Sequence, residues 1–136
     1  PISDHDILHV LEQVGLKDLA IRVSGNTADP YKGLNMELDW SHTLSLGEQQ
    51  RLAFGRIIIH QPRFIILDEA TSALDSTAEE NMYALLQCMD ARTKGSSSSR
   101  KVTYISVGHR PSLYNFHDQC LRLNSNIDGK HVLLDI

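Results

Sequence analysis

The chain has 136 residues, of which 41% are hydrophobic and 22% are charged, and its formal net charge is −4. This hydrophobic fraction is enough to build a core and argues against wholesale disorder. The charge balance lacks the basic excess typical of proteins that bind nucleic acid or anionic membrane surfaces. No apolar run approaches the roughly 18–20 residues needed to span a bilayer. The sequence begins with Pro1, and we expect it to be a segment of a longer protein.

The first third of the sequence is predicted to be largely helical. Ser3 is a candidate cap for a helix over residues 3–14, and Gly15 is its predicted end. A second, short helix is predicted over residues 16–23. Residues 24–43 contain two glycines and a proline and are predicted to form a loop.

A longer helix is predicted after this loop, from Ser45 to about His60. Ser45 and Glu48 form the S-x-x-E pattern of a capping box, in which each residue bonds the backbone N–H of the other. Pro62 marks the end of the helix, because the residue before a proline disfavours helical geometry.

The next element is a compact apolar run over residues 64–67 that closes on Asp68 and Glu69. The run is short and rich in β-branched residues, as is typical of a strand covered on both faces. The sequence therefore predicts a buried strand with all four hydrophobic side chains in the core.

A helix and a polar connector are predicted after this strand. Ser76 and Glu79 repeat the capping-box pattern and open a helix that runs to about Arg92. Residues 94–100 are dominated by serine and predict a flexible connector.

Three further strands are predicted beyond the connector. Residues 102–107 predict a second buried strand, and the strand–helix–strand order predicts a right-handed crossover that joins a parallel pair. Residues 119–123 and 131–135 predict two strands about a turn at Gly129.

Two carboxylates, Asp68 and Glu69, are predicted at the C-terminal edge of the parallel sheet. Ligands bind at this edge in open α/β folds. An acidic residue there can hold Mg²⁺ through water, and a neighbouring carboxylate can orient or deprotonate an attacking water. The alternative interpretation is a solvated strand end with two surface acids.

The start of the helix at Ser45 is a second candidate site. In the segment Leu44–Glu48 a serine and a glycine present a hydroxyl and backbone N–H groups to an anion, and the helix dipole adds favourable potential. The alternative is a plain capping box that uses the same Ser45 and Glu48.

His109 lies just beyond the second predicted strand, after Gly108. If the two strands are neighbours, His109 lies level with Asp68 and Glu69, where it can bond a terminal phosphate. The alternative is a loop histidine that is satisfied by its surroundings.

Taken together, four motifs resemble those of an ABC ATPase in their order and spacing. They are similar to the signature motif, the Walker B strand, the D-loop and the switch histidine, and stand at Leu44–Glu48, Phe64–Glu69, Ser72–Asp75 and His109. The sequence near the signature and the switch, Leu38–Trp40 and Val107–Pro111, is similar to subfamily D transporters. That group includes importers of fatty acyl compounds, cobalamin and peptides.

The resemblance implies a role for the signature segment in nucleotide binding. Ser45, Gly47 and Glu48 would contact ATP, with Ser45 and Gly47 reaching the γ-phosphate bound to a partner subunit. Asp75 would cross the interface of the same dimer.

The resemblance also implies a catalytic centre at the strand ends. Asp68 would serve Mg²⁺, through water, and Glu69 would be the catalytic base. His109 would sense the γ-phosphate. The cofactors implied are therefore ATP and Mg²⁺.

The sequence departs from the family pattern at two points. Leu46 stands where the family usually has glycine, and a side chain there restricts the backbone φ angle and crowds the approach of phosphate. No G-x-x-x-x-G-K-[ST] pattern is present, so we expect the P-loop and the glutamine-bearing switch loop to lie upstream of Pro1.

The fold class predicted is α/β, an incomplete P-loop NTPase core with a helical subdomain. Residues 1–60 would form the helical subdomain and residues 61–136 the C-terminal part of the nucleotide-binding core. In the ABC core the P-loop strand adjoins the strand that leads to the switch histidine. Residues 102–107 should therefore pair in parallel with residues 64–68 on one side and leave the other edge open. The tail strands should form a separate hairpin or shift inward.

The intact protein is predicted to hydrolyse ATP in a head-to-tail dimer and to drive the transmembrane domain of the same transporter. It would be an integral membrane protein, with this domain on the ATP-containing side and no nucleic-acid partner. A soluble ABC ATPase of DNA repair, chromosome structure or translation is the alternative, but coiled-coil heptads and a basic face are missing from the sequence. A regulatory module without turnover would lack the equivalent of Glu69 or His109, and both are present.

Overall fold

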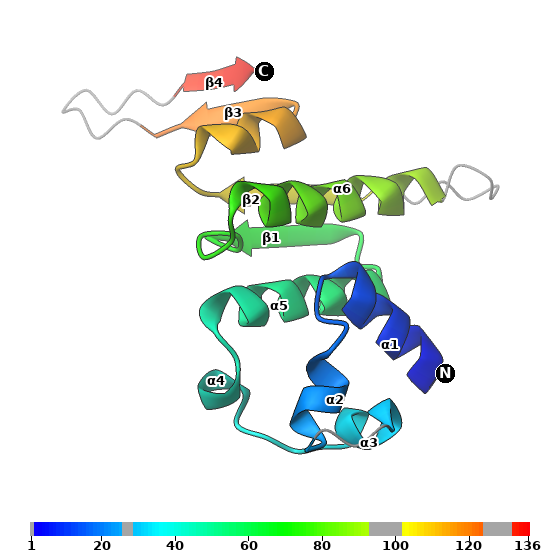
Figure 1. The fold of residues 1–136 in the computed structure, drawn as a ribbon. Helices are drawn as coiled ribbons and strands as arrows, with labels where there is room; N and C mark the ends of the chain where they lie inside the picture. Colours follow the sequence, from blue (N-terminus) through cyan, green and yellow to red (C-terminus); the bar gives the residue numbers. More distant parts are fainter. Residues whose placement is uncertain (1, 26–28, 93–101, 124–131) are drawn as a thin grey trace. The chain divides into compact units, whose positions relative to one another are not determined.

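The computed structural model describes residues 2–25, 29–92, 102–123 and 132–136. Its elements are α1 (Asp4–Gln13), α2 (Leu19–Val23), α3 (Pro30–Leu34), α4 (Trp40–Thr43), α5 (Leu46–His60), β1 (Phe64–Asp68), α6 (Ser76–Arg92), β2 (Thr103–Val107), the 3₁₀ helix η2 (Pro111–Phe116), β3 (Gln119–Arg122) and β4 (Val132–Asp135) (Figure 1). The chain divides into two compact units, Pro1–Ser106 and Val107–Ile136. The mixture of helices and a parallel strand pair confirms the predicted α/β class.

The strands form two separate two-stranded sheets within the described residues. β1 and β2 are parallel neighbours, as their arrowheads show in Figure 1. β3 and β4 pair antiparallel, with Gln119 opposite Asp135 and Arg122 opposite Val132. The predicted pairing of the two main strands and the predicted separate hairpin are therefore confirmed. The predicted connector at 94–100 and the turn at Gly129 lie outside the described residues.

Helix α1 begins and ends as its sequence predicts. The Ser3 hydroxyl accepts from the Asp6 N–H, and the Asp6 carboxylate accepts from the Ser3 N–H, which completes a capping box. At the other end Gly15 has φ +73°, and the Leu16 N–H donates to the Leu11 carbonyl over 2.7 Å. This is the Schellman arrangement that glycine favours, because it has no Cβ to clash in the left-handed region.

The segment predicted to be a loop over residues 24–43 contains two short helices, α3 and α4, so that prediction is wrong in part. Asp29 caps α3 by accepting from the Tyr31 N–H, with Pro30 in the first turn. Asp39 caps α4 by accepting from the Ser41 N–H. Each helix has at most five residues, which is too short to give a hydrophobic period. The aspartate caps were the available signal.

Helix α6 starts at the predicted residue, but its cap is different. Asp75 Oδ1 accepts from the Ala78 N–H at 2.8 Å, so the cap is Asp75 and not Ser76. The carboxylate of Glu79 is fully buried and accepts from the Thr71 hydroxyl at 2.7 Å. Aspartate and serine are both strong N-caps, and local sequence does not rank them when they are adjacent. The hydrogen bond of the buried Glu79 carboxylate with Thr71 is a tertiary contact that is present together with the Asp75 cap.

The aromatic core of the first unit joins α5, α6 and β2. The ring of Tyr83 on α6 lies edge-on to Phe54 on α5, with centroids 6.3 Å apart, and 6.0 Å from the ring of Tyr104 on β2. Its hydroxyl shares a hydrogen bond of 2.9 Å with Ser106. Such pairs add to the energy of burial, and this stack packs α6 onto one face of the sheet.

The other face of this sheet is exposed, contrary to the prediction of strands buried on both faces. In β1, Ile65 and Leu67 are buried, but Phe64 is 53% exposed and Ile66 is 67% exposed. In β2, Ile105 is 51% exposed. Side chains alternate between the faces of a strand, so cover on a single face leaves every second residue in solvent.

Helices α2 and α3 pack closely at Gly33. A Cβ atom at this position would lie 1.8 Å from the Ala20 carbonyl oxygen and 2.5 Å from its carbon. Glycine to alanine in a helix ordinarily stabilises by up to about 1 kcal/mol. Here we expect Gly33→Ala to lower the free energy of unfolding by at least about 3 kcal/mol, because the backbone of Ala20 must move.

Thermal and urea denaturation followed by circular dichroism measure this effect. Gly25→Ala is the matched control, because Gly25 has φ +78° but no atom of the described residues lies within 4 Å of its Cβ position. The control is expected to lose only about 1 kcal/mol through backbone strain. Equal losses in the two variants would contradict the packing argument.

Candidate functional site

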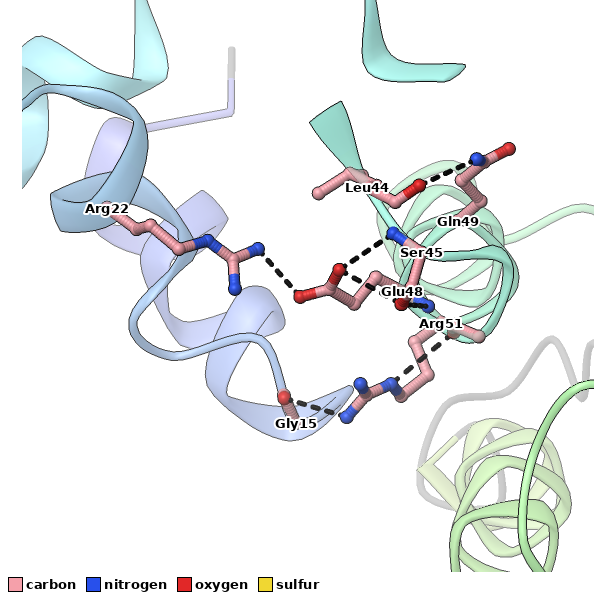
Figure 2. Close-up of polar contacts among 8 residues, drawn as sticks. Gly15, Arg22, Leu44, Ser45, Glu48, Gln49 and Arg51 are labelled. Carbon is pink, nitrogen blue, oxygen red and sulfur yellow. Dashed lines mark hydrogen bonds and ion pairs between the residues drawn. The ribbon is translucent and has the colours of Figure 1, made fainter. Parts of the chain in front are cut away.

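The N-terminus of α5 presents Ser45 at the surface (Figure 2). The Ser45 hydroxyl accepts from the Glu48 N–H at 3.3 Å, and Glu48 Oε2 accepts from the Ser45 N–H and hydroxyl at 2.9 and 3.0 Å. The predicted capping box is therefore confirmed. It holds an exposed hydroxyl at the positive end of a 15-residue helix, which is an arrangement suited to an anion.

The carboxylate of Glu48 is also bonded from α2. Its Oε1 accepts from Arg22 Nη2 at 2.6 Å, and the Glu48 side chain is only 16% exposed (Figure 2). The hydrogen bond from Arg22, followed by that from the Ser45 N–H, lowers the pKa of Glu48, and burial opposes them. Both oxygens thus have partners within the chain. Direct contact of Glu48 with nucleotide stays a prediction, while its contacts with Ser45 fix the start of the helix.

Arg51 joins the same helix to the end of α1. Its Nη1 donates to the Gly15 carbonyl at 3.0 Å, and its Nε donates to the Gly47 carbonyl at 3.4 Å (Figure 2). Two arginines, Arg22 and Arg51, therefore connect the first turns of α5 to the preceding helices. The start of α5 is held in place by side chains from outside the signature segment.

Leu46 is the first residue of α5 and its side chain is 59% exposed. Among the described non-glycine residues, positive φ angles occur at Gln61 and Glu69 only. The backbone at Leu46 therefore has a geometry that any residue adopts, and the expected restriction of φ carries no penalty. Crowding of phosphate by this side chain stays a prediction.

Asp68 and Glu69 are exposed at the C-terminal end of β1. Glu69 has φ +48°, and its carbonyl accepts from the Ser72 N–H at 3.1 Å, which closes a tight turn. Among the described residues no three His, Cys, Asp or Glu side chains gather to hold a metal. A single exposed carboxylate fits Mg²⁺, which is commonly held by one or two carboxylates with water and substrate phosphates.

Asp75 and His109 lie in different compact units. Asp75 is exposed and caps α6 in the first unit. His109 is exposed between β2 and η2 in the second unit. The first unit also holds Ser45, Asp68 and Glu69. The prediction that His109 lies level with the two carboxylates stays a prediction.

Sequence reasoning missed Arg22, Gln50 and Arg51, which contact the candidate site through their side chains. Gln50 and Arg51 lie two and three residues after the signature segment and are half-buried. The available signal was the presence of long polar side chains on a helix that packs against other elements. Buried polar groups of this kind need hydrogen-bond partners. Apart from Gly47, which is four residues from Arg51, their partners lie 19 to 36 residues away along the chain, and no local pattern gives that distance.

The ion pair at Glu48 predicts a pH-dependent contribution to stability. The pKa of Glu48 is below its ordinary value of 4.5 in the folded chain. Its ionised form therefore stabilises the fold above about pH 4.5, and this contribution is lost as the pH falls through the lowered pKa. We expect Glu48→Gln to lower the free energy of unfolding by about 1–2 kcal/mol at pH 7. The difference from wild type should shrink below about pH 4.

Denaturation curves at several pH values measure this difference. Glu12→Gln is the control, because the Glu12–Lys17 ion pair is exposed. The Glu12 side chain is 54% exposed and the Lys17 side chain is 73% exposed. Solvent screens such pairs, so the control is expected to resemble wild type. A Glu48→Gln deficit that is the same at pH 3 and pH 7 would contradict the electrostatic argument.

Comparison with known proteins identifies the family. Residues 2–72, which include the capped start of α5 and the end of β1, match the family model described as ABC transporter. The chain belongs to the ABC transporter family.

Relatives of this ABC transporter chain include D-type transporters. An uncharacterized ABC transporter ATP-binding protein of Synechocystis is 46% identical over 91% of the chain and 16% of the relative. ABC transporter D family member 2, chloroplastic, of Arabidopsis thaliana is 41% identical over 92% of the chain and 15% of the relative. A lysosomal cobalamin transporter of Mus musculus is 41% identical over 90% of the chain and 17% of the relative.

These similarities show an ABC transporter ATP-binding domain homologous to D-type transporters. The chain spans between 15% and 17% of the length of these three relatives. Within the described residues, no helix combines the length and apolar content required to cross a membrane.

Proposed function

We propose that this chain is part of an ATPase domain that powers transport by an ABC transporter. The observation that carries the proposal is a hydrogen bond within one compact unit, from the Gln50 side chain on α5 to the Glu69 carbonyl after β1. It links the helix with the exposed start to the acidic end of the strand, in a chain that belongs to the ABC transporter family. Residues 1–60 would form the helical subdomain and residues 61–136 would belong to the nucleotide-binding core. The domain would work as a head-to-tail dimer with a second nucleotide-binding domain.

In the proposed reaction, Glu69 is the general base. Its carboxylate takes a proton from a water whose oxygen attacks the γ-phosphorus of ATP, and the bond to the ADP oxygen breaks. Asp68 would hold Mg²⁺ through water. The bound ion would neutralise negative charge on the phosphates. His109 would bond the γ-phosphate from the loop after β2.

The start of α5 would act on the nucleotide of the partner subunit. Gly47 would offer its backbone N–H to the γ-phosphate, where donors aimed at developing charge are effective. The Ser45 hydroxyl donates to Glu48 Oε2 in this structure and would turn from it to the phosphate. Glu48 supports Ser45 through the capping box and is itself held by Arg22. Asp75 would approach the dimer interface from the cap of α6. Closure of such a dimer on ATP, and its reopening after hydrolysis, would shift a membrane domain between two states.

The remaining partner would be the transmembrane domain of the same transporter. The parent protein would be integral to a membrane, with this domain on the ATP-containing side. The relatives are ABC transporter proteins, which supports a transporter and not the soluble alternative of DNA repair or translation type.

ATP hydrolysis by the intact protein and by this chain alone tests the proposal. In lipid vesicles the intact protein is expected to release phosphate from ATP. The 136-residue chain alone is expected to release none and to bind ATP weakly, because its sequence lacks the P-loop pattern whose N–H groups and lysine cradle the phosphates. Turnover by the chain alone near the enzyme median of about 10 s⁻¹ would contradict this, and an intact protein that neither binds nor hydrolyses ATP would overturn the function.

A further inference from the structure

The side-chain amide of Gln50 connects α5 to the turn between β1 and α6. Its Nε2 donates to the Glu69 carbonyl at 3.1 Å and to the Ser72 hydroxyl at 2.9 Å. Its Oε1 accepts from the Ala73 N–H at 3.0 Å. One half-buried side chain therefore uses both N–H groups and its oxygen on a single turn.

The orientation of this amide is fixed by its partners. The Ala73 N–H can only donate and the Glu69 carbonyl can only accept, so exchanging the amide oxygen and nitrogen would break both bonds. The three contacts are thus mutually consistent. They make Gln50 specific for this turn, since no other uncharged side chain of this length offers donors and an acceptor together.

Gly47, one turn before Gln50, brings the helix close to the same turn. A Cβ atom at Gly47 would lie 3.1 Å from the Ala73 carbonyl oxygen and 3.5 Å from a methyl carbon of Leu74. Few side-chain carbons pack so closely against backbone. Gly47 and Gln50 therefore both contact one segment, residues 69–74.

The Glu69 backbone is the functionally sensitive part of this turn. Its φ of +48° is uncommon for a residue with a side chain, and such geometry persists when surrounding contacts over-determine it. The Gln50 bond to the Glu69 carbonyl is one of those contacts. It restrains the peptide group that follows the Glu69 Cα atom.

We infer that Gln50 is a positioning residue for ATP hydrolysis: it holds the turn of residues 69–73 against α5 and so couples the signature helix to Glu69. This inference rests on the proposed function. Motion of α5, whose start would face the partner's nucleotide, would be transmitted through Gln50 to the proposed base on its own subunit. Residue 69 would then reach its working position only when α5 is in place.

The test uses the intact protein and three variants at this position. Gln50→Ala removes the amide, Gln50→Met keeps its length without hydrogen bonds, and Gln50→Glu keeps an acceptor for the Ala73 N–H but loses the donors to Glu69. Each variant is expected to lower kcat for ATP hydrolysis by at least about tenfold, because small misplacements of a reacting group have effects of this size. The KM for ATP is expected to stay within about twofold, since Gln50 makes no proposed contact with nucleotide.

Gln87→Ala is the matched control, because Gln87 is an exposed glutamine on α6. It is expected to keep the wild-type kcat and KM. The thermal midpoint of each variant distinguishes a loss of positioning from a loss of folding. If Gln50→Ala does not fold, the kcat of Gln50→Met is the deciding measurement. Hydrogen exchange at the Ala73 amide is expected to speed up in Gln50→Met.

The outcomes separate this inference from the proposed function. Absence of ATP hydrolysis in the wild-type protein overturns the proposed function. A hydrolysing wild type with Gln50→Met at wild-type kcat overturns the role of Gln50 alone. A fall in kcat that only parallels a fall in thermal midpoint shows a structural role and also overturns it.

Discussion

Replacing Glu69 by glutamine in the intact protein is expected to lower steady-state ATP hydrolysis by roughly 10²–10⁴-fold, the usual contribution of a general base. The amide keeps the size and direction of the side chain at the exposed end of β1 but does not take a proton from water at neutral pH. ATP binding is expected to be unchanged, because the bonds to the Glu69 backbone do not depend on its side chain.

Phosphate release and equilibrium binding of labelled ATP measure these two quantities. Glu80→Gln on α6 is the control, because Glu80 is exposed and one turn or more from the start of that helix. The control is expected to hydrolyse ATP at the wild-type rate. Ordinary turnover in Glu69→Gln would show that another group is the base.

Replacing Ser45 by arginine is expected to abolish dimerisation driven by ATP. Ser45 is exposed at the start of α5, and a long cation there would occupy the position proposed for the partner's γ-phosphate. The thermal midpoint is expected to change little, because a helix cap contributes only about 1 kcal/mol. Light scattering with ATP, in the Glu69→Gln background that retains bound nucleotide, measures the dimer.

Ser45→Ala separates the cap from the interface. It loses the hydroxyl and the two bonds that the hydroxyl makes with Glu48 but adds no bulk. It is therefore expected to lose the same stability and to dimerise more weakly than wild type, whereas Ser45→Arg does not dimerise. Normal dimerisation of Ser45→Arg would favour the interpretation of a plain capping box.

The helix ends were predictable because they are encoded locally. The capping box of Ser45 and Glu48 lies within four residues and reappears in the structure with both bonds. Gln61, with φ +46°, ends α5 directly before Pro62, where the sequence placed the boundary. The cap of α6 was predicted at the wrong residue because Asp75 and Ser76 are adjacent and both are good caps. In the structure Asp75 is the cap, and Glu79 bonds the buried Thr71.

Properties that depend on distant neighbours were not predictable. The apolar run of residues 64–67 predicts a strand buried on both faces of the sheet. Ile66 is nevertheless exposed, because the described helices cover one face of the sheet only. The place of Asp68 and Glu69 after a strand was predictable and is confirmed, while the chemistry inferred from it stays a prediction. The contacts of Gln50 with the turn after them were not predictable, since they cross 19 to 23 residues of chain.

The left-handed backbone at Glu69 has a cost in stability that a glycine at the same position would not have. A residue with a Cβ atom at φ +48° is disfavoured by roughly 1–2 kcal/mol relative to ordinary helical geometry, while glycine adopts the same angles freely. Selection for stability alone would therefore place glycine at residue 69. The proposed role of Glu69 as the base would account for a glutamate at this position, and Glu69→Gly is expected to stabilise the domain at the expense of that proposed role.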